Sequence, residues 1–217
     1  MSRVLKSIMR KWRRASHFAR GLVNDRRGVA AIEFAMIVPI MLVLFFGTVE
    51  FSSGIAANRK VSLTARTLSD LTSRSISVSD SDLTNFFAAG SAIMAPYVPP
   101  LYNVTSATVS ELWIDPSTSN ARVQWSKGSV PLGLGTSVGI PTDLIVKDST
   151  GKALPYQYLI FSQVSYVYKP AIGYIMAKAG IKLSDVSYTR PRQTVCVVYP
   201  TPTSGALPSC PTSVTSP

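Results

Sequence analysis

The chain has 217 residues, with 22 Lys and Arg side chains against 11 Asp and Glu, so its formal net charge at pH 7 is +11. Apolar residues make up 46% of the sequence and charged residues only 15%, which excludes a disordered polyelectrolyte. One histidine and two cysteines exclude a His-rich metal centre and a zinc cluster of paired CxxC motifs.

The positive charge is concentrated before residue 28. The first 27 residues hold nine of the 22 basic side chains and a single acid, Asp25, so they carry +8 of the +11. Apolar residues recur among them at helical spacing, which predicts a basic amphipathic helix suited to an anionic membrane surface. Nucleic-acid binding is the rival interpretation, because any cationic cluster attracts phosphate, but no base-reading module accompanies this one. We expect a determinant of membrane topology and no nucleic-acid partner.

An apolar run follows at once, from Val29 to Val49, and its only charged residue is Glu33. About 21 residues of helix span ~31 Å, which matches a hydrocarbon core of ~30 Å. A helix that is apolar on every side would need a larger surrounding protein to bury it, so the run predicts a transmembrane helix. The basic block before it predicts a cytoplasmic N-terminus and residues 50–217 on the other side. A cleaved secretory signal is the alternative, but the run is longer than usual and no clean A-x-A site follows.

The boundary between these two segments reads Arg26-Arg27-Gly28-Val29-Ala30-Ala31-Ile32-Glu33-Phe34. Glycine has no Cβ and suits a position that must thread extended through a protease cleft. An ionisable group inside a membrane helix costs on the order of 2–3 kcal/mol, so Glu33 is expected to have a partner or a function. The alternative is that Glu33 lies close enough to the interface to reach water.

This junction resembles the processing site of type IV prepilins and, more closely, that of the TadE/TadF-like pseudopilins of the tight-adherence (Flp) pilus system. The resemblance is strong over roughly residues 26–70 and includes Pro39 and Glu50. It implies cleavage by a prepilin peptidase between Gly28 and Val29, which places Glu33 fifth in the mature chain. By analogy with pilins, Glu33 would pair with the Val29 amine of an adjacent subunit.

The resemblance also implies a place for the protein and a set of partners. The place is the bacterial inner membrane, spanned once, with the C-terminal domain extracytoplasmic. The resemblance is compatible with entry of the chain into the pilus. The partners are membrane lipid, prepilin peptidase, other pilin or pseudopilin subunits and the pilus assembly platform. No cofactor is implied.

The rest of the chain predicts an α+β fold, with helices first and an antiparallel sheet after them. Five segments carry the prediction: a helical arm with an apolar face of Phe51, Ile55, Val61, Leu63, Leu68 and Leu71; a second helix that starts among Ser79, Asp80 and Ser81 and ends at Pro96; a hairpin of 103–115 and 121–126; a central strand at 156–168; and a last strand at 184–199. Residues 127–155 are expected to form a long loop with a short strand at 144–147, and Pro39 is expected to kink the first helix without breaking it. The expected organisation is therefore a leader at 1–28, a transmembrane helix at 29–49, a helical arm at 50–96 and a sheet domain at 97–217.

Cys196 and Cys210 both lie in the part placed outside the cytoplasm, where oxidising conditions favour a disulfide between them. Two independent buried thiols are the alternative. His17 is the sole histidine and lies in the leader, so the mature chain lacks a Ser-His-Asp or Cys-His pair. No phosphate-binding glycine motif occurs either, and we expect no catalytic residue, no metal site and no enzyme. The alternatives to a pilin-like subunit are an uncleaved membrane-anchored extracytoplasmic binding protein and a membrane-tethered nucleic-acid binder.

Overall fold

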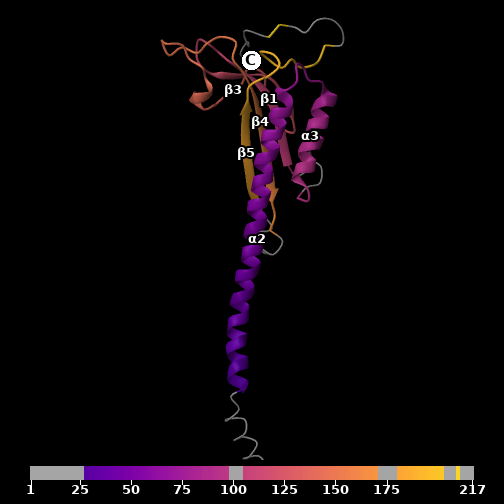
Figure 1. Ribbon diagram of the computed structural model, residues 1–217, viewed down its shortest axis with the longest axis vertical. Helices are drawn as coiled ribbons and strands as arrows, with labels where there is room; N and C mark the ends of the chain where they lie inside the picture. Colours follow the sequence, from indigo (N-terminus) through magenta and orange to yellow (C-terminus); the bar gives the residue numbers. More distant parts are fainter. Residues whose placement is uncertain (1–26, 98–104, 171–179, 203–208, 211–217) are drawn as a thin grey trace, which may run out of the picture. The chain divides into compact units, whose positions relative to one another are not determined.

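A computed structural model describes residues 27–97, 105–170, 180–202 and 209–210 (Figure 1). The predicted basic helix before residue 27 and a helical turn that we expect near 175–178 lie outside the described residues. The chain divides into two compact units, Met1–Glu50 and Phe51–Pro217. Each unit is described by itself.

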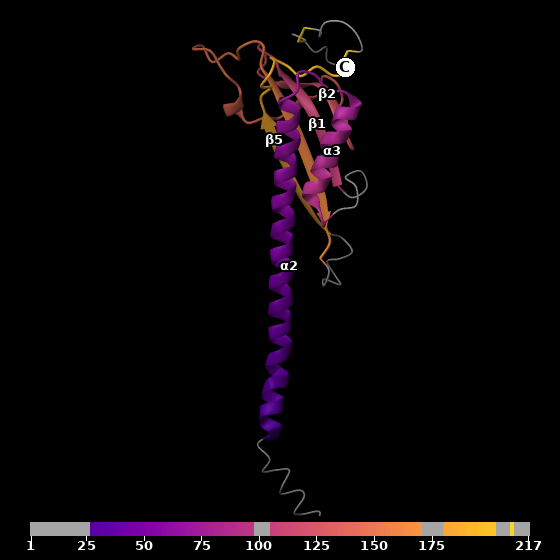
Figure 2. The same cartoon turned by 45° about the vertical axis from the view of Figure 1, so that its right-hand side comes forward.

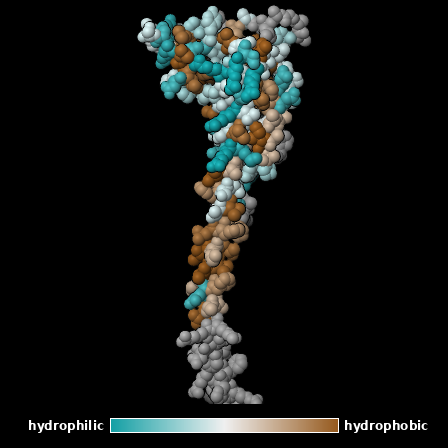
Figure 3. Space-filling model, viewed as in Figure 1, coloured by the Kyte–Doolittle hydropathy of each residue, from teal (hydrophilic) through white to brown (hydrophobic). Residues whose placement is uncertain are grey.

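The first unit contains the beginning of helix α2, which runs from Arg27 to Ser73 and continues through Pro39 without a break. Among the described residues, α2 is the one helix long and apolar enough to cross a membrane. Apart from Val38, which is partly exposed, its large apolar side chains between Val29 and Val49 are 40 to 72% exposed, so the described chain does not bury them. Figure 3 shows hydrophobic side chains over the visible face of this part of the helix. This exposure fits a single-pass membrane protein.

The second unit is an antiparallel five-stranded sheet with two helices on one face (Figures 1 and 2). The strands are arranged in the order β3-β2-β1-β4-β5, so β4 has neighbours on both sides as predicted. The α+β prediction is confirmed. Besides the end of α2, the elements are α3 (Asp80–Met94), β1 (Thr105–Ile114), β2 (Ala121–Gly128), β3 (Ser137–Val138), the 3-10 turn η1 (Thr142–Leu144), β4 (Tyr158–Tyr168) and β5 (Ile181–Thr189).

The main core lies between the helices and the sheet. It combines Val61 and Leu68 of α2 and Phe87 of α3 with Val109 and Val164 of the sheet. A second cluster lies on the opposite face of the sheet and joins Leu112, Val123, Leu159 and Phe161 with apolar residues of the excursion between β2 and β4.

Helix α3 is fixed at both ends by polar contacts. Ser79 is its N-cap: the Ser79 hydroxyl accepts from the Asp82 N–H, and the Asp82 carboxylate accepts from the Ser79 N–H, which forms a capping box. At the other end, the Lys60 ammonium on α2 donates to the carbonyls of Ile93 and Ala95. A cation at a helix C-terminus also interacts favourably with the helix dipole.

The structure corrects the predicted apolar face of the helical arm. Val61 and Leu68 are buried, but Phe51, Ile55 and Leu63 are exposed. The buried stripe of α2 instead consists largely of small and hydroxyl side chains, because here the helix packs closely on the sheet. The buried side chains of this stripe are Ala57, Val61, Thr64, Ala65, Leu68, Ser69, Thr72 and Ser73.

Two predicted strands are also corrected. The last strand, predicted at 184–199, is β5 at Ile181–Thr189, so it starts earlier and ends ten residues sooner. The prolyl nitrogen of Pro191 cannot donate to a ladder, and the Arg192 N–H donates to the Ser73 carbonyl at the end of α2. In the excursion, the short strand is β3 rather than 144–147, where the structure has one isolated bridge between Lys147 and Ala153.

Candidate functional site

The predicted processing residues lie at the beginning of α2. Gly28 and Val29 occupy its first turn, and Glu33 follows Val29 by four residues, which places both on the same side of the helix. All three residues are exposed. Among the described residues Glu33 has no ion pair, so its charge lies on an apolar surface without a partner.

The N-terminal end of a helix leaves its first backbone N–H groups without intrahelical acceptors. A Cβ added to Gly28 would meet no atom within 4 Å, so packing does not require glycine at this position. Glycine destabilises a helix by about 1 kcal/mol relative to alanine, which makes the first turn easier to unwind. The junction is therefore accessible and only weakly held in the helical state.

Cys196 and Cys210 form a disulfide, with their Cα atoms 5.7 Å apart. The predicted pairing is thus present in the structure. Cys196 is buried and packs with Trp113 of β1 and Tyr158 of β4, and Cys210 contacts this cluster from its edge. The bond closes a loop within the C-terminal segment and attaches residue 210 to a cysteine that the sheet holds in place.

Residues 196–201, which we call the strap, begin at the first cysteine and pair with the link between α2 and α3. The Val78 N–H donates to the Val198 carbonyl at 2.9 Å, and the Val198 N–H donates to the Ile76 carbonyl at 3.2 Å. The Thr201 N–H donates to the Val78 carbonyl at 3.1 Å. The strap is therefore bound by backbone hydrogen bonds to a segment more than a hundred residues away in sequence.

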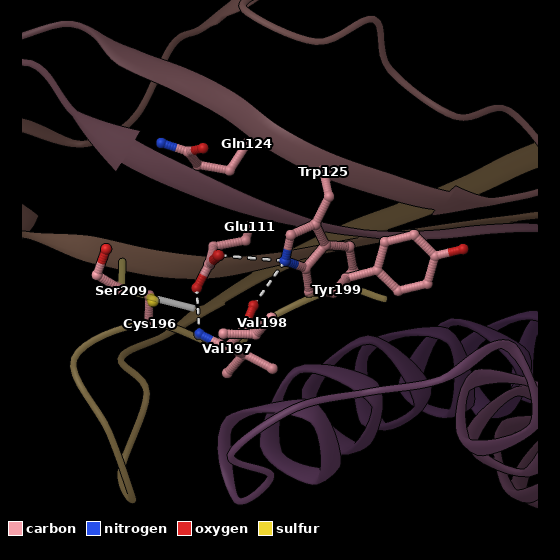
Figure 4. Close-up of a pocket in the computed structure, with 8 residues that line it drawn as sticks. All are labelled: Glu111, Gln124, Trp125, Cys196, Val197, Val198, Tyr199 and Ser209. Carbon is pink, nitrogen blue, oxygen red and sulfur yellow. Dashed lines mark hydrogen bonds between the residues drawn. The ribbon is translucent and has the colours of Figure 1, made fainter. Parts of the chain in front are cut away.

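A buried carboxyl group holds the other side of the strap (Figure 4). Glu111 on β1 is 2% exposed. One of its oxygens, Oε1, accepts from the Val197 N–H at 2.6 Å, and the other, Oε2, accepts from the Trp125 indole N–H at 3.1 Å. The same indole N–H also donates to the Val197 carbonyl at 2.8 Å. Glu111 and Trp125 together satisfy both backbone groups of Val197.

Burial raises the pKa of Glu111 to about 8, and the hydrogen bonds from Val197 and Trp125 oppose this rise. A carboxyl group with this pKa is mostly protonated at neutral pH, so the interior does not have to hold a full charge. The protonated form keeps an acceptor oxygen for the Val197 N–H. Sequence reasoning missed Glu111. Its signal was a single acid inside the apolar strand, at the alternation position that faces the core with Val109.

A cavity of about 140 Å³ adjoins this carboxyl group. The amide nitrogen Nε2 of Gln124 is buried there and has no hydrogen-bond partner among the described residues. The cavity is lined by the Glu111 carboxyl, the Gln124 amide and the Trp125 indole, among other groups. The hydrogen bonds of Glu111 and Trp125 bind the strap. The residues that line the cavity are Glu111, Gln124, Trp125, Cys196, Val197, Val198, Tyr199 and Ser209.

Within the described residues, no group of three or more His, Cys, Asp or Glu side chains is placed to hold a metal ion. The predicted site residues fall in two places, the start of α2 and the disulfide. Gly28, Val29 and Glu33 lie at the first, and the second joins Cys196, at the beginning of the strap, to Cys210.

Comparison with known proteins identifies one family. A family model described as TadE-like protein matches residues 28–68, a segment that begins at the predicted processing glycine and ends within the buried stripe of α2. The match confirms the resemblance to TadE-like proteins over the apolar helix and most of its continuation. No curated protein and no solved structure matches the chain.

Proposed function

We propose that this chain, whose residues 28–68 match the TadE-like family, is a minor pilin-like structural protein cleaved by prepilin peptidase after Gly28. The family suggests a role in tight-adherence pilus assembly and association with pilus components. The observation that carries the finer proposal is the position of Gly28. It is at once the first residue of the family match, the end of the basic leader and a member of a weakly held first helical turn.

Cleavage at this position would create the partner that Glu33 lacks. The new α-amine of Val29 carries a positive charge and forms at the beginning of an apolar helix. A carboxylate four residues further along the helix lies about one turn, or ~5.4 Å, away. When such helices pack side by side in a filament, the amine of one subunit can pair with Glu33 of its neighbour and remove the cost of an isolated charge.

The charge distribution supports a membrane orientation with the N-terminus in the cytoplasm. A leader with a net charge of +8 stays on the cytoplasmic side of a bilayer, so we propose that the second unit lies outside the cytoplasm of a bacterial inner membrane. The disulfide supports this side, because disulfides persist in oxidising compartments. For the mature chain we propose a structural role without catalysis.

The test is the N-terminal sequence of the full chain recovered from membranes, with and without co-expressed prepilin peptidase. We expect a start at Val29 that depends on the peptidase. Gly28→Val should abolish the cut, whereas Gly47→Val should leave it intact, since Gly47 also lies in α2 with no atom within 4 Å of an added Cβ. A start at Met1 under both conditions would support the alternative, an uncleaved membrane-anchored binding protein.

A second experiment separates processing from assembly. We expect Glu33→Gln to be cleaved normally and to reduce piliation when the chain is expressed with the pilus assembly system that it serves. Glu50→Gln is the matched control, because Glu50 is the other carboxylate of the same helix in the first unit. Normal piliation with a correctly cleaved Glu33→Gln chain would refute the pairing with Val29.

A further inference from the structure

One end of the sheet lies close to the point where the chain enters the second unit. At this end β4 stops at Tyr168 and β5 begins at Ile181, and these two residues are paired. A Cβ placed on Gly54 would lie 3.8 Å from the Tyr168 ring. Gly54 follows Phe51, the first residue of the unit, by three residues or ~4.5 Å of helix. The end of the sheet therefore lies beside the first helical turns of the second unit, which in sequence follow the apolar run ending at Val49.

Apolar side chains at this end are open to solvent. Phe51 is 71% exposed, and Ile55 and Ile181 are each 42% exposed. Phe51 and Ile55 belong to α2 and Ile181 to the edge strand β5, so the exposure is shared by two elements. Exposed apolar groups that gather at one end of a domain mark an interaction surface more often than isolated ones do.

The same end carries cations that the protein does not use. Arg59 on α2, Lys169 after β4 and Lys182 on β5 are exposed. In the part of the chain that the structure describes, none of the three has an ion pair or a side-chain hydrogen bond. Their neighbour Lys60 differs, because its ammonium group is committed to the C-terminal carbonyls of α3.

Three other cations of the unit are paired with described carboxylates. Arg74 and Arg192 both bind the Asp70 carboxylate, at 2.6 and 2.8 Å. Lys127 lies 3.4 Å from the Asp80 carboxylate. Asp70 follows Gly54 by sixteen residues of α2, or ~24 Å, so these pairs lie far from the end where β4 stops. Lys147 and Lys152 of the excursion also have no ion pair among the described residues, so Arg59, Lys169 and Lys182 are distinguished by their position beside exposed apolar side chains.

Two acids are close in sequence to the exposed residues of the end where β4 stops. Glu50 directly precedes Phe51, and Asp185 is three residues further along β5 than Lys182. They leave an excess of positive charge among Arg59, Lys169 and Lys182. A surface with exposed Phe and Ile side chains among unpaired Lys and Arg matches a phospholipid interface, where apolar groups enter the acyl boundary and cations bind phosphate.

We propose that this end of the sheet domain, which we call the basal surface, rests on anionic phospholipid headgroups of the same bilayer that holds residues 29–49. The basal surface consists of Phe51, Ile55, Arg59, Lys169, Ile181 and Lys182. The proposal depends on membrane insertion of the apolar helix but not on cleavage after Gly28. Contact with the bilayer would restrict the tilt of the sheet domain on its helix and so present β5 in a fixed orientation to neighbouring subunits.

The experiment uses the full chain in nanodiscs of phosphatidylcholine, with or without 30% phosphatidylglycerol, and follows backbone hydrogen exchange of residues 181–189 by mass spectrometry. An anionic surface contributes a factor on the order of fivefold per nearby Lys or Arg. We therefore expect at least fivefold slower exchange at the start of β5 in the anionic nanodiscs, reversed by 0.5 M salt. The salt comparison uses the unmodified chain, so it does not depend on how any variant folds.

Lys169→Gln with Lys182→Gln should abolish the difference between the two lipids. Lys147→Gln with Lys152→Gln is the matched control, because these two lysines are also exposed but belong to the excursion between β2 and β4. Equal exchange in both lipids would overturn the proposal, as would a lipid effect that the basal variants keep or that the control variants also lose. If the chain does not co-elute with nanodiscs, the predicted membrane span is refuted. If the leader is still attached, only the predicted cleavage after Gly28 is contradicted.

Discussion

The titration of Glu111 predicts an unusual dependence of stability on pH. Its pKa is about 8 in the folded chain against 4.5 for the ordinary group, because burial disfavours the charged form. The folded state therefore binds more protons than the unfolded state between these two values, and the free energy of unfolding falls as the pH rises. From pH 4.5 to pH 7 the loss amounts to about 3 kcal/mol at ~1.4 kcal/mol per pH unit.

Replacing Glu111 with Gln removes this titration and keeps a neutral side chain of nearly the same shape. The amide oxygen still accepts from the Val197 N–H, but its NH₂ group cannot accept from the Trp125 indole. That loss costs about 1 kcal/mol at every pH, with the indole still bonded to the Val197 carbonyl. The two stability curves should meet near pH 5, and Glu111→Gln should be the more stable form by about 2 kcal/mol at pH 7.

The assay is urea unfolding of the full chain in detergent at pH 5, 6, 7 and 8, followed by tryptophan fluorescence. Asp115→Asn is the matched control, because hydrogen bonds, chiefly from the Ser117 hydroxyl, lower the Asp115 pKa from 3.8 and its titration falls below this range. Tyr158 is the titratable neighbour of Glu111, and burial raises its pKa to about 12, so it stays neutral throughout. Parallel curves for the unmodified chain and Glu111→Gln would refute the reasoning.

Three further changes test separate parts of the second unit by the same urea assay. Replacing Cys196 and Cys210 together with Ser should lower the free energy of unfolding by about 3 kcal/mol, because a closed loop of this length no longer restricts the unfolded chain; unchanged stability would contradict this. Gly128→Ala should lower the free energy of unfolding by roughly 3 kcal/mol, since φ at this position is +142° and the new Cβ would lie 2.1 Å from the Ala107 carbonyl oxygen of β1. Gly139→Ala is the control and should leave stability unchanged, because its Cβ would meet no atom within 4 Å. Ser79→Ala should cost about 1 kcal/mol through loss of the α3 cap, and Ser79→Thr, which keeps the hydroxyl, should restore most of it.

Local signals in the sequence predicted most of the secondary structure. The run of Ser79, Asp80 and Ser81 specified where α3 begins, because a capping side chain acts on N–H groups two or three residues away. The turn residues at 115–117 specified the β1–β2 hairpin, which the structure confirms. The disulfide followed from there being only two cysteines, both in the part placed outside the cytoplasm.

Long-range choices of partner were not predictable in the same way. Residues 195–199 have a strand-like composition, so the sequence predicts them to be part of the last strand at 184–199. In the structure the chain leaves β5 at Thr189, and Val198 pairs with the link between α2 and α3 instead. Composition favours an extended backbone without specifying which of several edges it pairs with. The role of Glu111 was hidden for the same reason, since its partners Trp125 and Val197 come from two other segments.

Helix α2 passes through two different surroundings. Up to Val49 its side chains are predominantly apolar, with Glu33 as the charged exception, and its exposed apolar surface suits a lipid environment. From Ala57 onward, small and hydroxyl residues let the helix approach the sheet closely enough for the Ser162 hydroxyl to donate to the Ala65 carbonyl. Both surroundings restrict which side chains fit, and the match to residues 28–68 spans these two stretches. The excursion, the strap and the outer face of the sheet lie beyond the matched residues, so the resemblance to TadE-like proteins does not extend to them.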